Sequence, residues 1–488
     1  MIKLRHKFHE HILILGASQT STVIFNEISQ AYLKPDKKIV MLAQKEPDSE
    51  SIAELQNRFI FYKGNPSLES DLLRVEPWKA DAICINLFGQ PDGDMQTFAI
   101  LSVLKPLLDS KNAQPLLIAI IAKEQYKQKL INYGFNEESL VCVETLFPYI
   151  AAQVCRQKNL KAVFNEILSV KGNDIYQYPS TEFIGSTWSK VLRAFENACP
   201  IGIKQNGSFV FNPDQNTLIT EETELLILAS DLKKISMAPA FLPAPDYNEI
   251  VSGNLESDRE ESFLILGWGT EGTPLISKLK DLSEAPKTIL IVSEKDPLVS
   301  DFSKSNLSIA WQNANQHKSD ILETIKFEYF ENIIICAEGG PDSSAEIELL
   351  QRVKEILART GLTNNITIIL GALTQETKAI QESLSTDIII KLATQILLHP
   401  PLLHLSRELI QPKKAKIYLN PVENYVEIDS EVNFYTLIEA ARKKNETAIG
   451  YITQLETGTK VTLNPMKDQK QKFYHFDRII VFSNKNVK

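Results

Sequence analysis

One short pattern, a strand followed by a glycine turn and a helix, occurs twice in this chain and constrains its fold more than any other feature. The better copy is SFLILGWGTEG (262–272), where an apolar run stops at Gly267, Gly269 and Gly272. A G-x-G-x-x-G turn after a strand is typical of loops that hold a dinucleotide pyrophosphate against a helix N-terminus. The weaker copy is HILILGASQTS (11–21). The chain is therefore predicted to use one unit twice.

Each copy opens a segment in which short apolar runs alternate with amphipathic stretches. This alternation predicts a parallel sheet covered by helices on both faces, as in a Rossmann-like fold. The expected strands are 11–16, 38–43, 59–64, 82–88, 115–121 and 139–144 in the first segment, and 263–267, 288–293, 307–311, 332–337, 365–371 and 386–391 in the second. Helices are expected between them, for example over 21–32, 95–108 and 144–157.

A smaller α+β segment follows each Rossmann-like segment. The first has an expected helix over 187–197 and strands in ENACPIGIKQ, SFVFNP and TELLILASD, and the second has a helix over 432–445 and strands in TAIGYIT and RIIVFS. Both small segments contain an Ile-Gly pair, at 201–202 and 449–450, and then an Asn-Pro turn, at 212–213 and 464–465. A repeat of this size indicates duplication of a two-domain module.

The predicted fold class is α/β, with two Rossmann-like, doubly wound parallel-sheet domains, each followed by a small α+β domain. The predicted domains are a first Rossmann-like domain with its crossover helix (1–160), a first small domain (161–240), a Pro-rich exposed linker (241–260), a second Rossmann-like domain (261–402) and a second small domain (403–488).

Composition excludes several functional classes. A net charge of −9 argues against a nucleic-acid-binding scaffold, which needs a cationic face. No apolar run approaches the roughly 18 to 20 residues that cross a bilayer, and the N-terminus has no signal-peptide core. The five cysteines form no C-x-x-C pair and are expected to be buried, reduced thiols. The seven histidines show no metal-ligand spacing.

The second glycine turn supplies the candidate cofactor-binding residues. They are Gly267, Gly269, Thr270 and Gly272 in the turn, with Glu294 after the next strand placed to accept hydrogen bonds from ribose hydroxyls. Bulky Trp268 and acidic Glu271 oppose this interpretation, and the alternative is a turn kept for tight helix–strand packing.

The first glycine turn is a poorer candidate. Ser18 and Ser21 replace its second and third glycines, and Gln44 stands near the place of the ribose-binding acid. A Cβ at the second position crowds a pyrophosphate, so a structural turn is the preferred interpretation.

An acidic stretch, CAEGGPDSSAEIE (336–348), follows the fourth strand of the second segment. Glu338 and Asp342, with Glu346 nearby, could offer oxygen ligands to Ca²⁺. The alternative is that these acids are solvated and favoured by the dipole of the next helix.

No catalytic constellation is visible, so the chain is not expected to be an enzyme. His317 follows a strand, but no paired carboxylate or nucleophile accompanies it, and there is no G-x-S-x-G, H-E-x-x-H or Walker A motif. A nicotinamide-dependent oxidoreductase is the alternative of this class.

Taken together, these residues resemble a known family. The paired layout is similar to tandem RCK (TrkA-N plus TrkA-C) domains, and the blocks ENACPIGIK…NPD and NFYTLIEAARKKNETAIGY, with HILILGAS and FLILGWGTEG, resemble the cytosolic region of CASTOR/POLLUX ion channels. The similarity covers essentially the whole chain. One departure is the loop LFGQPDGDMQ, which has Gly89 and Gln90 where the family has acids, although Asp92 and Asp94 remain.

The resemblance implies a non-catalytic sensor of a cation (potassium or calcium) channel. Four chains would form a ring of eight modules beneath a pore at the cytoplasmic face of the membrane, and crossover helices near 145–160 and 390–410 would pair neighbouring modules. Ca²⁺, an adenine nucleotide or NAD is the expected ligand, and no nucleic acid is expected. Because only MIKLRHKF precedes the first strand, the pore is expected either in a longer form of this chain or in a separate protein that a TrkA-like subunit would regulate.

Overall fold

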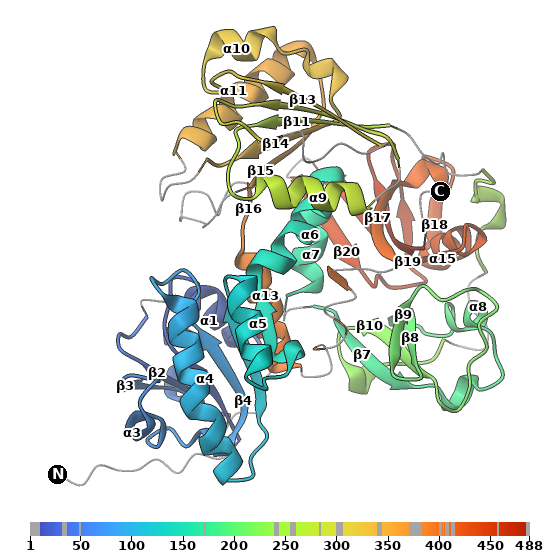
Figure 1. Cartoon of the computed structure of the whole chain (residues 1–488). Coiled ribbons are helices and arrows are strands. Elements are labelled where there is room, and N and C mark those ends of the chain that lie inside the picture. Colours follow the sequence, from blue (N-terminus) through green and yellow to red (C-terminus); the bar gives the residue numbers. More distant parts are fainter. Residues whose placement is uncertain are drawn as a thin grey trace. The chain divides into compact units, whose positions relative to one another are not determined.

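The computed structural model describes residues 10–31, 37–47, 50–169, 172–238, 244–253, 260–282, 285–298, 306–338, 344–369, 383–399, 403, 405, 409–410, 415–455 and 458–484. The chain divides into two compact units (Figure 1). One unit comprises residues 1–147, 168–171 and 386–407, and the other comprises 148–167, 172–385 and 408–488.

The first unit contains a six-stranded, all-parallel sheet in the order β3-β2-β1-β4-β5-β6. Its central strands are fully buried, as expected of a parallel sheet covered on both faces. The strands are β1 (His11–Leu15), β2 (Ile39–Ala43), β3 (Phe59–Lys63), β4 (Ala80–Asn86), β5 (Leu116–Ile121) and β6 (Leu140–Cys142). The helices between them are α1 (Ser21–Gln30), α2 (Glu50–Glu54), α3 (Glu69–Leu72), α4 (Gly93–Ser110) and α5 (Glu124–Asn132).

A helix from late in the sequence completes this unit. Helix α13 (Asp387–Leu398) packs against α1 and against the β4 and β5 side of the sheet. The Lys391 ammonium lies 3.7 Å from the carboxylate of Glu27 on α1, and the Gln395 amide donates to the carbonyl of Leu168. The first sheet therefore depends on a helix from a distant part of the chain, which begins at Asp387 although the last strand of the sheet ends at Cys142.

The second unit contains a second six-stranded parallel sheet with the same topology, β13-β12-β11-β14-β15-β16. The two predicted Rossmann-like sheets are thus confirmed. The strands are β11 (Glu261–Leu266), β12 (Lys287–Val292), β13 (Leu307–Gln312), β14 (Asn332–Cys336), β15 (Asn365–Ile369) and β16 (Ser383–Leu384). Its helices include α9 (Gly272–Leu282), α10 (Ser319–Thr324) and α11 (Ser344–Thr360).

The sixth strand of this sheet was predicted wrongly. The run TDIIIK (386–391) was expected to be a strand because its isoleucines favour one, but it forms the first turns of α13. The apolar residues continue through Leu392 and Ile396 and are buried on nearly all sides, which a helix packed between a sheet and another helix requires. Tertiary packing overrides local strand propensity here.

Helix α6 (Val143–Arg156) leaves the first sheet and runs into α7 (Leu160–Ile167). From Pro148 onward these residues belong to the unit that holds the second sheet. Each Rossmann-like segment is therefore followed by a helix that packs in the unit of the other segment.

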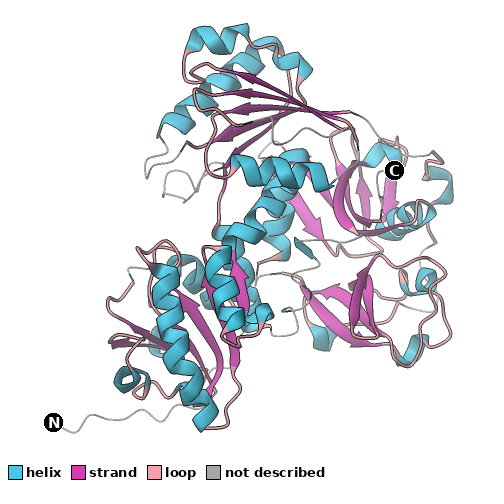
Figure 2. Ribbon diagram, in the orientation of Figure 1, coloured by secondary structure: helices cyan, strands magenta, loops and turns pink. Residues whose placement is uncertain are grey.

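The two small domains form antiparallel four-stranded sheets in matching orders, β7-β10-β8-β9 and β17-β22-β19-β20 (Figure 2). The strands are β7 (Asp174–Pro179), β8 (Ala198–Gln205), β9 (Ser208–Phe211), β10 (Glu224–Ala229), β17 (Lys416–Pro421), β19 (Glu446–Leu455), β20 (Gly458–Leu463) and β22 (Arg478–Ser483). The remaining elements are α8 (Trp188–Val191), α15 (Phe434–Lys443) and a ribbon of β18 (Glu431–Asn433) with β21 (Lys470–Lys472).

Two local predictions for these domains differ from the structure. The helix expected over 187–197 is only the four residues of α8, because the following segment turns into β8. The described part of the expected linker, 244–253, is held by hydrogen bonds to the second small domain. The Val251 N–H donates to the carbonyl of Tyr425 at 3.0 Å, and the Asp246 N–H donates to Thr436 Oγ1 at 2.9 Å. This stretch is fixed to the second small domain.

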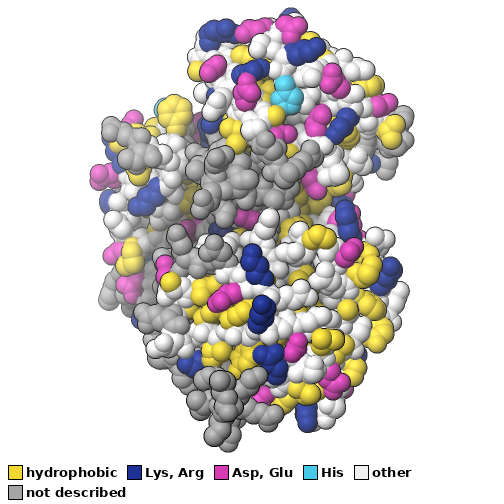
Figure 3. All heavy atoms as spheres, turned by 90° about the vertical axis from the view of Figure 1, so that its left-hand side faces the viewer, with side chains coloured by type: hydrophobic (Ala, Val, Ile, Leu, Met, Phe, Trp, Pro, Cys, Tyr) yellow, Lys and Arg dark blue, Asp and Glu magenta, His cyan; other side chains and the backbone are white. Residues whose placement is uncertain are grey.

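No helix among the described residues is long and apolar enough to cross a membrane. The face drawn in Figure 3 carries Lys and Arg side chains interspersed with Asp and Glu over its described residues. All five cysteines are buried and unpaired, as predicted.

Candidate functional site

The three glycines of the second turn are required by contacts within the chain itself. Gly267 has φ +88°, a conformation that glycine adopts without strain. A Cβ at Gly269 would lie 1.9 Å from the carbonyl oxygen of Ala337, and one at Gly272 would lie 2.8 Å from the ring of Trp268. The alternative of a turn kept for tight packing therefore explains every glycine of the motif.

The carboxylate of Glu338 points into this turn. Its Oε1 accepts hydrogen bonds from the Trp268 N–H at 3.3 Å, the Ser293 hydroxyl at 3.1 Å and the Gln316 amide at 3.1 Å. The Lys295 ammonium donates to the Glu338 carbonyl at 2.7 Å. A backbone N–H, a hydroxyl and an amide are the donors that a phosphate oxygen would use at such a turn. An internal carboxylate already uses them here.

The remaining residues predicted to bind a nucleotide or a metal ion do not take part in the hydrogen bonds around Glu338 described above. Thr270 is exposed, and the exposed Glu294 accepts a hydrogen bond from the Asn315 amide at 3.1 Å. Asp342, predicted with Glu338 as a metal ligand, lies outside the described residues. Within the described part of the chain, no three His, Cys, Asp or Glu side chains are grouped so as to hold a metal ion.

Hydroxyl groups fill the first glycine turn. The Ser18 N–H donates to the Ser21 hydroxyl at 3.0 Å, and the Ser18 and Thr20 hydroxyls are 2.9 Å apart. Thr20 in turn bonds the buried amide of Asn86 at the end of β4. These contacts favour the preferred interpretation, a structural turn.

The two acids that remain in the loop after β4 also differ in their roles. Asp94 is buried, and its carboxylate accepts the N–H groups of Ala122 at 2.7 Å and Lys123 at 2.8 Å. Asp92 is exposed, with φ +54° at the start of α4. Asp94 therefore fixes the loop after β5.

The Ile-Gly and Asn-Pro repeats are parts of one structure in each small domain. The isoleucine of each pair lies at a β-bulge. Ile201 is the extra residue opposite Leu226 and Ile227 of β10, and Ile449 is the extra residue at the matching register shift between β19 and β22. Its carbonyl accepts the N–H of the Asn in the turn, Asn212 to Ile201 at 3.0 Å and Asn464 to Ile449 at 2.8 Å. Both asparagines have positive φ, a conformation that Asn tolerates well.

The same two asparagine side chains join the small domains to each other. Asn212 donates to the carbonyl of Asn445 at 2.9 Å and accepts from the Thr447 hydroxyl at 2.8 Å. Asn464 donates to the carbonyl of Asn197 at 2.8 Å and accepts from the Cys199 thiol at 3.3 Å.

Counted from the two Ile-Gly pairs, Asn197 and Cys199 correspond to Asn445 and Thr447. The exchange is therefore reciprocal, as between two copies related by a two-fold axis. Phe211 and Phe482 stack beside it with ring centroids 4.9 Å apart. The sequence contained the signal, since both Asn-Pro turns were visible as repeats, but it did not show that their side chains reach the other domain.

Helices α6 and α7 are anchored to the second sheet and the second small domain. The Arg156 guanidinium at the end of α6 pairs with the Glu261 carboxylate at the start of β11, with Nε 3.0 and 3.1 Å from its two oxygens. The Gln157 amide donates to the carbonyl of Ile417 and accepts from the N–H of Leu419 on β17. Burial, with Arg156 nearby, lowers the pKa of Lys416 to about 8.

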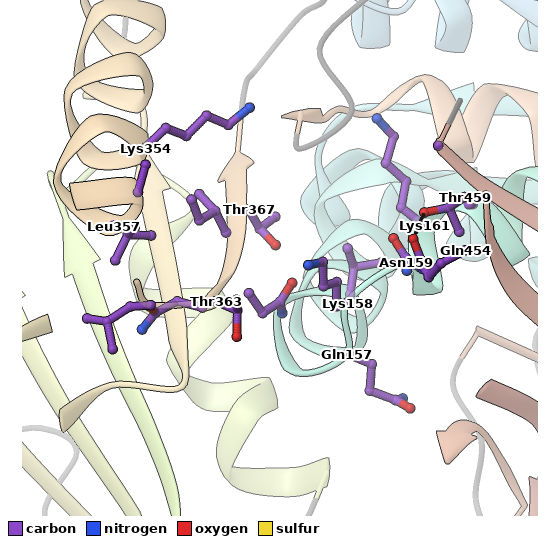
Figure 4. Close-up of a pocket in the computed structure, with 18 of the residues that line it drawn as sticks. Gln157, Lys158, Asn159, Lys161, Lys354, Leu357, Thr363, Thr367, Gln454 and Thr459 are labelled. Carbon is purple, nitrogen blue, oxygen red and sulfur yellow. Dashed lines mark hydrogen bonds between the residues drawn. The ribbon is translucent and has the colours of Figure 1, made fainter. Parts of the chain in front are cut away.

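A cavity of about 620 Å³ opens beside these helices (Figure 4). Its walls are the α6–α7 connection, the end of α11 with β15, and the hairpin of β19 and β20, all within the second unit. Lysines from α7 and α11 line it together with hydroxyl and amide groups. Nothing in the sequence patterns pointed to this cavity, because its walls come from three separate segments.

Family comparisons agree with this architecture. Residues 144–243 match the family described as Castor and Pollux, part of voltage-gated ion channel. Residues 7–91 match the calcium-activated potassium channel slowpoke-like RCK domain. The structure of the human SLO3 gating ring superposes with a TM-score of 0.64 at 13% identity, covering 97% of this chain and 99% of that one. That likeness supports the fold.

Curated relatives extend the similarity along the chain. A probable ion channel CASTOR from Oryza sativa subsp. japonica is 23% identical over 97% of this chain and 60% of its own length. The ion channel CASTOR from Lotus japonicus is 23% identical over 97% of this chain and 62% of its own length. The chain thus spans about three-fifths of the length of these relatives. With its duplicated Rossmann-like and small domains, the chain has the architecture of a tandem RCK (TrkA-N/TrkA-C) region and is similar to the CASTOR/POLLUX ion channels over nearly its whole length.

Proposed function

We propose that this chain is the ligand-sensing gating-ring region of a CASTOR/POLLUX-like cation channel, without catalytic activity of its own. Four chains would form a ring of eight modules at the cytoplasmic mouth of a pore, which lies in the same or a separate polypeptide. Ligand binding to the ring would then be coupled to pore opening.

The observation that carries this proposal is the exchange of crossover helices. Helix α13 packs on the first sheet, and α6 from Pro148 onward packs with the second sheet and second small domain. Modules that exchange helices in this way behave as a joined pair. Repeating such a pair around a symmetry axis gives a closed ring.

Such a ring can gate a pore only if its ligand distinguishes two ring shapes. A ligand with equal affinity for both shapes would shift nothing, however tightly it bound. At the predicted nucleotide site, Gly267, Gly269, Thr270, Gly272 and Glu294, an adenine nucleotide or NAD would have to displace the Glu338 carboxylate from its donors. Ca²⁺ at Glu338 would compete for the same side chain.

The assembly is tested by light scattering on the purified chain over a concentration series. The expected mass of the ring is four times the 55.0 kDa of one chain. A monomer at every concentration, with and without Ca²⁺ or NAD, would contradict the ring. Steady oxidation or reduction of a nicotinamide cofactor by the same protein would contradict the non-catalytic role.

A further inference from the structure

The cavity beside α7 has a lining with a consistent chemical character. Lys158 lies in the connection between α6 and α7, Lys161 lies in the first turn of α7, and Lys354 lies on α11. In Figure 4, Lys158 and Thr367 point into the space from opposite sides, and Lys354 and Lys161 extend toward it from their helices. None of its described lining residues is Asp or Glu. The described walls therefore favour an anion.

The three lysines can bind an anion without giving up their contacts within the chain. Each ammonium has three N–H donors, so it can keep a protein partner and still donate to a ligand. Lys158 and Lys354 are exposed, Lys161 is half-buried, and all three line the cavity. The hydroxyls of Thr363 and Thr459 add donors without adding charge.

Part of the lining is apolar. Leu357, Leu362 and Ile366 contribute aliphatic surface next to the lysines. A bare inorganic ion would leave this surface unused, whereas a molecule with an organic part would cover it. The cavity volume of about 620 Å³ is that of a typical small-molecule site.

We propose that this cavity binds small organic phosphates. A phosphate group offers several acceptor oxygens and close to two negative charges, which suits several separate lysine point charges better than a single carboxylate would. This inference does not depend on ring assembly. A ligand in the cavity would contact the crossover helix, the second sheet and the second small domain at once, and would stabilise the second unit through mass action.

The test is calorimetric titration of the full chain with AMP, ribose 5-phosphate and inorganic pyrophosphate, with adenosine as the uncharged probe. AMP and ribose 5-phosphate are expected to bind, adenosine is not, and the affinity should fall as NaCl screens the lysines. The double substitution Lys158→Gln and Lys161→Gln should weaken binding by about 10-fold or more, since each removes a charge-assisted hydrogen bond. Lys190→Gln, at an exposed lysine of the first small domain, is the matched control and should bind as the unchanged chain does.

A second variant does not depend on the lysines. Thr459→Glu, on the half-exposed hairpin, places a carboxylate in the cavity wall and should also weaken AMP binding. The proposal is overturned if neither AMP nor ribose 5-phosphate binds, whether or not inorganic pyrophosphate does. It is equally overturned if phosphate affinity is the same in the unchanged chain, the lysine double variant and Thr459→Glu, because binding would then lie elsewhere, for example at the second glycine turn.

Discussion

Glu338 shows how a single side chain can change the meaning of a motif. At the second glycine turn, three donors from different elements converge on one of its oxygens. Convergence of a backbone N–H, a hydroxyl and an amide stabilises a negative charge, whether that charge belongs to a phosphate or to the protein. The turn keeps the geometry of the motif, and the Glu338 carboxylate accepts the hydrogen bonds that a phosphate would otherwise accept.

Removing this carboxylate should make the turn receptive to an added anion. We expect Glu338→Ala to lower the unfolding midpoint, because the N–H of Trp268, the Ser293 hydroxyl and the Gln316 amide lose their acceptor. We also expect ADP to raise the midpoint more in this variant than in the unchanged chain. Glu338→Gln, which keeps an acceptor oxygen, is the control. Equal ADP responses in all three proteins would show that Glu338 does not occupy the phosphate position.

His11 is the first residue of β1 and is completely buried. Burial lowers its pKa from 6.5 to about 4, against smaller opposing contributions from the carbonyl of Val75 and the charge of Glu76. The histidine is therefore neutral in the folded chain at pH 5, where an unfolded chain would hold the proton. Its contribution to stability is present above pH 6.5 and is lost as the pH falls toward 4.

This linkage gives a pH-dependent prediction. Between pH 7 and pH 5, His11 should account for a loss of about 2 kcal/mol in the free energy of unfolding. His11→Leu, which cannot take up a proton, should lose correspondingly less stability over the same interval. Chemical denaturation at the two pH values measures both. Parallel pH profiles for the two proteins would contradict the assignment.

At the scale of elements, the small domains are joined by a repeated device. The bulge, the glycine that follows it and the Asn-Pro turn form one unit in each domain, and the Asn side chain of each unit is bonded to the other domain. A glycine is needed after the bulge because a Cβ at Gly450 would lie 2.2 Å from the carbonyl oxygen of Thr462. Gly202 has the same relation to Val210.

We predict that Asn212→Gly and Asn464→Gly each destabilise the chain by about 1–3 kcal/mol, because the buried Thr447 hydroxyl and Cys199 thiol lose their acceptors. Glycine adopts the positive φ without strain but adds entropy to the unfolded chain, so the loss in excess of a matched Asn→Gly control reports the side chain. Asn206→Gly, at an exposed turn residue that also has positive φ, is the control. Urea unfolding of the single and double variants measures the coupling between the two sites. Losses no larger than that of the control would show that the interface does not depend on these side chains.

At the scale of the whole molecule, the first sheet is not complete in its own stretch of sequence. Nine of the twelve residues of α13 are buried, and this helix covers α1 together with β4 and β5. A fragment of residues 1–147 would expose that apolar surface to water. Exposed apolar patches of this kind promote association.

We therefore expect the fragment 1–147 to aggregate or to unfold at a lower temperature than the same fragment fused through a flexible linker to residues 383–399. Light scattering and thermal denaturation compare the two. A fusion in which Ile389 and Ile396, both buried on α13, are replaced by Ser controls for the linker. Equal stability of all three fragments would contradict the dependence on α13.

The sequence allowed much of the fold to be predicted, because local patterns record local constraints. The β1 and β11 runs with their glycine turns, and the helix over 432–445, follow from periodicity and turn chemistry that each segment carries by itself. The run 386–391 was misassigned for the same reason: its strand propensity is local, whereas the surfaces that bury α13 lie more than 250 residues earlier in the chain.

By itself, the sequence determined that the chain is a duplicated pair of Rossmann-like and small domains, since the glycine turns, Ile-Gly pairs and Asn-Pro turns recur in order. Only the tertiary structure decided what those motifs do. Glu338 enters the second turn, Asn212 and Asn464 bond the opposite small domain, and Lys158 and Lys354 come to one cavity because folding brings together segments that no sequence window contains. Such sites depend on distances of a few ångströms between remote residues, and periodicity records only the neighbours of each residue.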